Sequence, residues 1–194
     1  MSTIPRVLLL GDSIRMSYQP FVAQLLEGKA DVVGPSVNCQ YSLYTLSSLP
    51  HWIAELGKPD IVHWNNGMHD VGHNPYRSPV QIPIEMYRAN LEFILRSLLE
   101  LTPHVIWATS TLVHPHRPFY DDRWSWRNEE IDEYNRVATE LMNKNGIPIN
   151  DLHTLVFESI EAFLADDGLH LSEAGQAACA RAVAQAISVY LPQD

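Results

Sequence analysis

The chain has 194 residues, of which 46% are hydrophobic, and its 13 basic and 23 acidic side chains give a formal net charge of −10. This length suits one well-buried domain, so we expect a single domain over residues 1–194. The negative charge repels polyphosphates and anionic lipids, which argues against nucleic acid and membranes as partners. No segment has the length of a membrane span and no signal-peptide pattern precedes the first apolar run, so we expect a cytoplasmic protein.

Short apolar runs alternate with helical patterns along the chain, which is typical of an α/β domain. We expect strands at residues 6–10, 31–33, 61–64, 105–109 and around 147–150. Apolar residues at helical spacing predict helices at residues 20–27, 84–101, 129–145 and 172–190. Cys39 and Cys179 are too few for a disulfide framework and lack metal-ligand spacing, so we expect neither role for them.

The tripeptide Gly11-Asp12-Ser13 directly follows the first apolar run. A serine at the carboxyl edge of an open parallel sheet points into the crevice where small ligands bind. Near the other end of the chain, Asp167 stands three residues before His170, and these are the two groups that activate a serine. Each motif alone is ordinary turn chemistry, but together they predict Ser13 as nucleophile, His170 as base and Asp167 as its orienter.

Oxyanion donors are expected from the loops after the second and third strands, at the same edge of the sheet. The second loop, residues 34–42, offers a backbone N–H, and the third, residues 65–70, offers polar side chains. A backbone N–H from the second loop and a side-chain donor from the third could join the N–H of Ser13 around a developing negative charge.

These blocks resemble the SGNH (GDSL) hydrolases, a family of esterase- and lipase-like serine hydrolases. Its members carry a serine in a Gly-Asp-Ser block, a glycine, an asparagine in a Gly-x-Asn-Asp block and a carboxyl-terminal Asp-x-x-His block. The resemblance covers essentially the whole chain. It implies a three-layer α/β/α, flavodoxin-like sandwich with a five-stranded parallel sheet. It also implies metal-free and cofactor-free ester hydrolysis through an acyl-enzyme on Ser13, with His170 and Asp167.

The third family block departs from this pattern, because it reads Gly67-Met68-His69-Asp70. His69 therefore stands at the asparagine position. A neutral imidazole can donate one N–H, so we expect His69 to keep the donor role. Asn65 and Asn66 are alternative amide donors.

The second family block lacks its glycine. Because that glycine acts through its backbone N–H, another residue can replace it if its φ and ψ are tolerated, and we choose Gln40. Asn38 and Ser42 are residues that could instead orient the loop. The predicted oxyanion hole is Ser13, Gln40 and His69.

Residues 110–127 show no regular pattern and contain three bulky aromatic side chains, Phe119, Trp124 and Trp126. A loop of this length in a compact domain is often a lid or binding loop, so we expect it to overhang the site. The alternative is that its aromatic residues cover a satellite core.

Substrate contacts are expected from arginine side chains and flat aromatic faces near these loops, which suit an acylated sugar. The alternative is that the arginines pair with neighbouring carboxylates. The predicted substrate-binding residues are Asp12, Arg15, Asn66, Trp124 and Arg127.

Four residues of types that bind metal ions lie close together in the sequence: His63, His69, Asp70 and His73. No helical i, i+4 histidine pair or cysteine accompanies them, so we predict no metal ligands.

The sequence predicts a serine esterase that removes a short acyl group such as acetyl from a carbohydrate through an acyl-enzyme. A lipid-directed esterase, a lysophospholipase or a thioesterase of the same fold is the alternative within this chemistry. A non-catalytic carbohydrate-binding or scaffold protein with a degenerate oxyanion hole is the alternative from another class. The oligomeric state stays open.

Overall fold

A computed structural model describes residues 4–74 and 80–192. Its central sheet has five parallel strands in the order β2-β1-β3-β4-β5, which is the flavodoxin-like order. The strands are β1 (Arg6–Leu10), β2 (Asp31–Val33), β3 (Ile61–Trp64), β4 (Val105–Ala108) and β5 (Ile149–Asn150).

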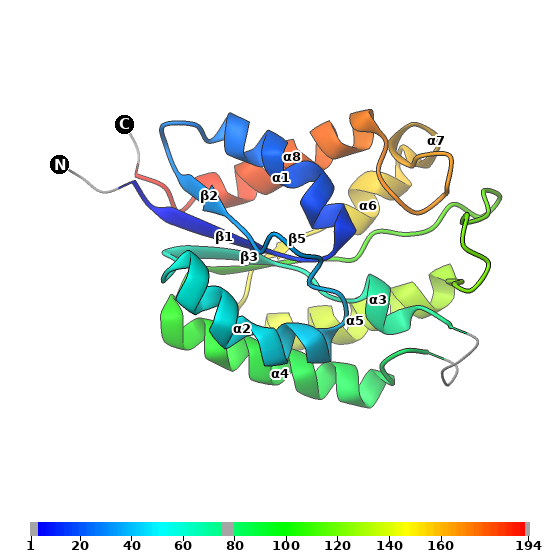
Figure 1. Cartoon of the computed structure of the whole chain (residues 1–194), viewed down its shortest axis with the longest axis horizontal. Helices are drawn as coiled ribbons and strands as arrows, with labels where there is room; N and C mark the ends of the chain where they lie inside the picture. Colours follow the sequence, from blue (N-terminus) through cyan, green and yellow to red (C-terminus); the bar gives the residue numbers. More distant parts are fainter. Residues whose placement is uncertain (1–3, 75–79, 193–194) are drawn as a thin grey trace.

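Helices cover both faces of the sheet, so the molecule has three layers (Figure 1). One face carries α1 (Ser13–Leu25), α6 (Leu152–Phe157), α7 (Ile160–Phe163) and α8 (Glu173–Ser188). The other carries α2 (Ser42–Leu56), α3 (Met68–Val71), α4 (Ile84–Leu101) and α5 (Asn128–Lys144). None of these helices is long and apolar enough to cross a membrane.

The two faces of β1 belong to two separate cores, as the alternation of side chains along a strand requires. Leu8 and Leu10 pack in the cluster under α2 and α4, whereas Val7 and Leu9 pack in the cluster under α1 and α8. All four side chains are essentially inaccessible to solvent. Burial on both faces explains why the strand is a continuous apolar run rather than an alternating one.

The strands match the predicted positions, with β4 and β5 slightly shorter than predicted. The predicted helix start at Pro20 is wrong, because α1 begins at Ser13, and α2 was not predicted at all. Both helices contain a proline, Pro20 or Pro50, which removes one backbone hydrogen bond from a helix. Both prolines are exposed, so water can satisfy the carbonyl group that each leaves unpaired.

The loops that carry the predicted site follow the carboxyl ends of the strands. In Figure 1 they lie at the edge of the sheet opposite the two chain termini. The segment before α8, which contains Asp167 and His170, returns to this same edge.

Candidate active site

Ser13 is the first residue of α1, directly after β1. The side chain of Asp12 accepts a hydrogen bond from the Ile14 N–H at 2.9 Å and so caps the helix. At the first helical turn the Ser13 N–H has no intrahelical acceptor, which leaves it available to a ligand. The Ser13 Oγ atom lies 3.1 Å from His170 Nε2.

The other ring nitrogen of His170, Nδ1, contacts the carboxylate of Asp167. His170 Nδ1 lies 2.7 Å from Asp167 Oδ2, and Asp167 Oδ1 accepts the backbone N–H groups of Leu169 and His170 at 3.0 and 2.9 Å. Partial burial disfavours the charged carboxyl, but these hydrogen bonds outweigh it and hold the pKa of Asp167 below its usual value. An ionised Asp167 favours the ring proton on Nδ1, so that Nε2 is free to accept the Ser13 proton.

A cavity of about 310 Å³ opens beside Ser13 and His170. Aromatic side chains of the 110–127 loop line it, and two of them, Trp124 and Trp126, are nearly parallel, with ring centroids 6.0 Å apart. The Trp126 Nε1–H donates to the Met68 carbonyl at 2.8 Å, which ties this loop to α3. The loop therefore overhangs the site as predicted, and Trp126 also packs against the core, which was the alternative.

His69 lines the same cavity from α3. Burial lowers its pKa; Asp12 opposes this shift and His170 adds to it. His69 is therefore a neutral imidazole around pH 7, which can donate one N–H. Its Nε2 atom lies 3.4 Å from Asn38 Nδ2, in the loop after β2.

Gln40 has a φ of 51°, in the left-handed region that favours glycine. Its N–H, however, donates to Asn38 Oδ1 at 2.7 Å, and Gln40 does not line the cavity. The predicted oxyanion role of Gln40 is therefore corrected: its N–H is used within the loop.

The GDSL-like lipase/acylhydrolase family model matches residues 9–178, which span all of these elements. The chain belongs to this family. It is thus an acylhydrolase, an enzyme that acts on ester bonds, and the matched residues include Ser13, Asp167 and His170.

Solved structures share the fold of this acylhydrolase. A lipase/acylhydrolase from Enterococcus faecalis superimposes with a TM-score of 0.80 at 21% identity, over 98% of each chain. The acetylxylan esterase Axe2 from Geobacillus stearothermophilus gives 0.76 at 21% identity, over 94% of each chain. The acetyl xylan esterase AlAXEase gives 0.77 at 16% identity, over 94% of this chain and 99% of that one. No curated protein sequence matches the chain significantly.

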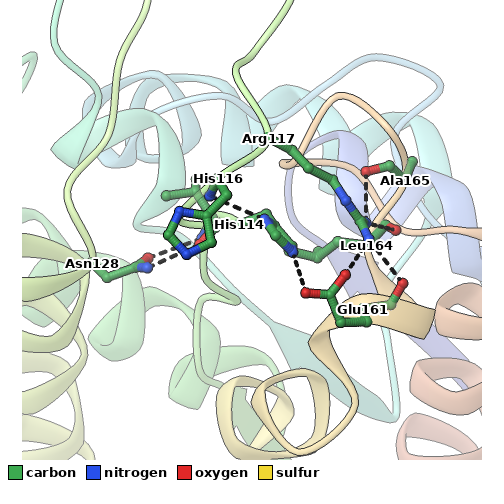
Figure 2. Close-up of polar contacts among 8 residues, drawn as sticks. His114, His116, Arg117, Asn128, Glu161, Leu164 and Ala165 are labelled. Atoms are coloured by element: carbon green, nitrogen blue, oxygen red, sulfur yellow. Dashed lines mark hydrogen bonds and ion pairs between the residues drawn. The ribbon is translucent and has the colours of Figure 1, made fainter.

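The overhanging loop of the acylhydrolase is fastened to the loop that holds Asp167 and His170. The His114 N–H donates to the Gly168 carbonyl at 2.7 Å, and His114 Nε2 lies 2.9 Å from Glu161 Oε1. Arg117 contacts the other oxygen of Glu161 at 2.6 Å and the Leu164 carbonyl at 2.8 Å (Figure 2). Movement of one loop must therefore disturb the other.

Arg15 and Asn66, predicted to bind substrate, are buried supports instead. The Arg15 guanidinium donates to the carbonyl groups of Pro35 and Val37 at 3.0 and 2.9 Å. The Asn66 amide donates to the Gln40 carbonyl at 3.1 Å. Both side chains face the second loop from inside the protein, so this part of the prediction is wrong.

Of the other three predicted substrate residues, two lie away from the cavity and one lines it. Asp12 is buried and caps α1, and Arg127 is exposed and pairs with Glu130 at 3.2 Å, so neither lines the cavity. Only Trp124 of the predicted set does. Asn38 and Tyr120 line the cavity but were not predicted as substrate residues. The sequence feature that could have indicated Asn38 is its position in the loop after the second strand.

The residues considered for a metal site have separate partners. His63 lies in β3 with its Nε2 atom 3.0 Å from Asn150 Nδ2, His73 contacts Glu130, and Asp70 binds Ser42. Among residues 4–74 and 80–192, no three histidine, cysteine, aspartate or glutamate side chains are grouped to hold a metal ion.

Proposed function

We propose that this acylhydrolase is a serine esterase that removes a short acyl group, acetyl, from a carbohydrate. The observation that carries the proposal is the hydrogen-bonded series Asp167–His170–Ser13, which ends at a cavity lined by tryptophan side chains.

In the first step the Ser13 Oγ atom adds to the ester carbonyl carbon while its proton moves to His170 Nε2. The carbonyl π electrons move to the oxygen, giving a tetrahedral oxyanion, and Asp167 stabilises the imidazolium. Collapse of the oxyanion breaks the bond to the alcohol, which takes the proton from His170. Water then repeats the sequence on the acyl-enzyme, which releases the acid and restores Ser13.

The N–H of Ser13 and the imidazole of His69 support the oxyanion in this proposal. Because its pKa is lowered, His69 is a neutral imidazole that donates an N–H hydrogen bond to the oxyanion. Proton transfer in the reaction is left to His170.

The cavity supports a small substrate. Its volume of about 310 Å³ is at the lower end of ligand sites, which suits an acetyl group and part of a sugar better than a long acyl chain. The flat faces of Trp124 and Trp126 offer apolar surface to a sugar ring. Two of the proteins with the same fold are described as acetyl xylan esterases, which is consistent with this substrate class.

The test measures acetate released from acetylated xylo-oligosaccharides, together with kcat/KM on p-nitrophenyl esters of increasing chain length. We expect acetate release and the highest kcat/KM for the acetyl ester. A maximum at long acyl chains would favour the lipid-directed alternative instead. Absence of hydrolysis of every ester would favour the non-catalytic binding protein.

A further inference from the structure

The loop after β2 presents a side-chain amide to the cavity. Asn38 is half-buried and lines the same cavity as Ser13, His69 and His170. The mechanism above makes no use of it. An amide carries two N–H donors, which is what an oxyanion requires.

The orientation of this amide follows from its partner. A backbone N–H can only donate, so the Asn38 atom that lies 2.7 Å from the Gln40 N must be the oxygen. The NH₂ group is therefore the other end, and it lies 3.4 Å from His69 Nε2.

The loop that carries Asn38 is held from inside the protein. Arg15 donates to the carbonyl groups on either side of Ser36, and Asn66 donates to the carbonyl of Gln40. The Cys39 N–H donates to the Gly11 carbonyl at 3.2 Å, which joins the loop to the residues before Ser13. The two residues next to Asn38, Val37 and Cys39, are thus each held by a hydrogen bond. The backbone at Asn38 is therefore in place before substrate binds, as electrostatic preorganisation requires.

We propose that Asn38 is an oxyanion donor of this esterase and acts together with His69. Two nitrogen atoms 3.4 Å apart can both lie about 2.9 Å from one oxygen atom, the distance expected of oxyanion donors. For His69 to donate through Nε2, its ring proton must lie on that nitrogen, and the 3.4 Å contact with the Asn38 NH₂ group is then an approach of two donors and not a hydrogen bond. The side chain of Asn38 then takes the place that the family gives to a glycine N–H. The inference rests on the proposed function.

Asn38→Asp tests it with the least disturbance of shape. Aspartate keeps an oxygen for the Gln40 N–H but replaces the donor with an oxygen that repels the oxyanion. We expect kcat on p-nitrophenyl acetate to fall by about 10² to 10³-fold, with KM changed much less. Asn38→Ala removes the donor without adding charge and is expected to lower kcat by a similar factor.

Asn143→Asp is the matched control, because Asn143 is exposed on α5 and its replacement adds the same charge. It is expected to keep the wild-type kcat. Rates are normalised to the folded fraction measured by circular dichroism, so that a loss of structure is not counted as a loss of catalysis.

The outcomes separate the two proposals. If wild type hydrolyses the ester and Ser13→Ala does not, the proposed nucleophile stands. Asn38→Asp and Asn38→Ala within threefold of the wild-type kcat would then overturn the role of Asn38 alone. If Ser13→Ala hydrolyses the ester as fast as wild type, the proposed function fails first, whatever the Asn38 variants do.

Discussion

The carboxylate of Asp167 binds His170 twice, once at the ring and once at the backbone. Its Oδ2 atom lies 2.7 Å from His170 Nδ1, and its Oδ1 atom accepts the His170 N–H at 2.9 Å. The side chain that orients the base thus also fixes the turn from which the base projects. Ring orientation and loop conformation depend on the same two oxygen atoms.

Asp167→Asn is expected to lower kcat by about 10³ to 10⁴-fold, because a neutral amide does not favour the productive tautomer or stabilise the imidazolium. KM should change much less. Steady-state kinetics on p-nitrophenyl acetate measures both. The neighbouring Asp166 is exposed, so Asp166→Asn is the control for the loss of one charge and should retain full activity. Similar rates for the two variants would contradict the role of Asp167.

His69→Ala is expected to lower kcat by about 10² to 10³-fold with little change in KM, because one oxyanion donor is lost. His69→Asn restores an N–H donor and should retain much of the wild-type rate. Burial lowers the pKa of His69, so His69 itself should not titrate in the pH range of the acidic limb of the kcat/KM profile. That limb should therefore be unchanged in His69→Asn. Wild-type rates in both variants would remove His69 from the mechanism.

Gly168→Ala should loosen the connection between the overhanging loop and the loop of Asp167 and His170. Gly168 has a φ of 70°, and an added Cβ would collide with the Arg117 carbonyl oxygen. Gly28→Ala is the matched control, because Gly28 has a φ of 75° and open space around it. In both variants the alanine must adopt a left-handed backbone conformation, which lowers the free energy of unfolding by about 1 kcal/mol.

We expect only Gly168→Ala to show a further fall in the melting temperature and a fall in kcat of roughly tenfold or more, since small displacements of catalytic groups are costly. Thermal unfolding and steady-state kinetics of the two variants measure this difference. Equal effects at Gly168 and Gly28 would show that the loops are not coupled.

Asp70 is expected to make the protein less stable as the pH rises. It is buried against Ser42, and burial raises its pKa to about 7 from 3.8, although hydrogen bonds from Ser42 favour the charged form. Because the folded state holds this proton more tightly than the unfolded state, the stabilisation is complete below pH 3.8 and is lost as the pH rises to about 7.

Asp70→Asn removes this titration and is the reference. Urea unfolding at about pH 4.5 and about pH 8 should show the wild type losing stability relative to Asp70→Asn at the higher pH. Other titrating groups are common to both proteins and cancel in the difference. A difference in unfolding free energy that does not change with pH would contradict the raised pKa.

The strands and the triad could be predicted because both depend on simple constraints. A strand buried on both faces, such as β1, must be a continuous apolar run, and the carboxyl ends of parallel strands must meet at one edge. Ser13 and His170 are therefore brought together by topology, although 157 residues separate them. The part of α1 before Pro20 could not be predicted, because its stability comes from packing of residues such as Tyr18 on the sheet and not from local preference.

The contacts within loops depended on details that a single sequence does not contain. Arg15 and Asn66 stand beside site residues in the sequence, yet both turn inward to backbone carbonyl groups. Gln40 was predicted to offer its backbone N–H to the oxyanion, but this N–H donates to Asn38 Oδ1. A rotation at one residue decides whether a group faces the cavity or the loop, and only the three-dimensional structure shows it.

The central claim is that Ser13 is the nucleophile, and covalent labelling by a fluorophosphonate tests it most directly. Wild type should gain one phosphonyl group, located on Ser13 by peptide mass spectrometry, while Ser13→Ala should gain none. Labelling of Ser13→Ala to the same extent as wild type, or no labelling of folded wild type between about pH 6 and about pH 9, would contradict the account.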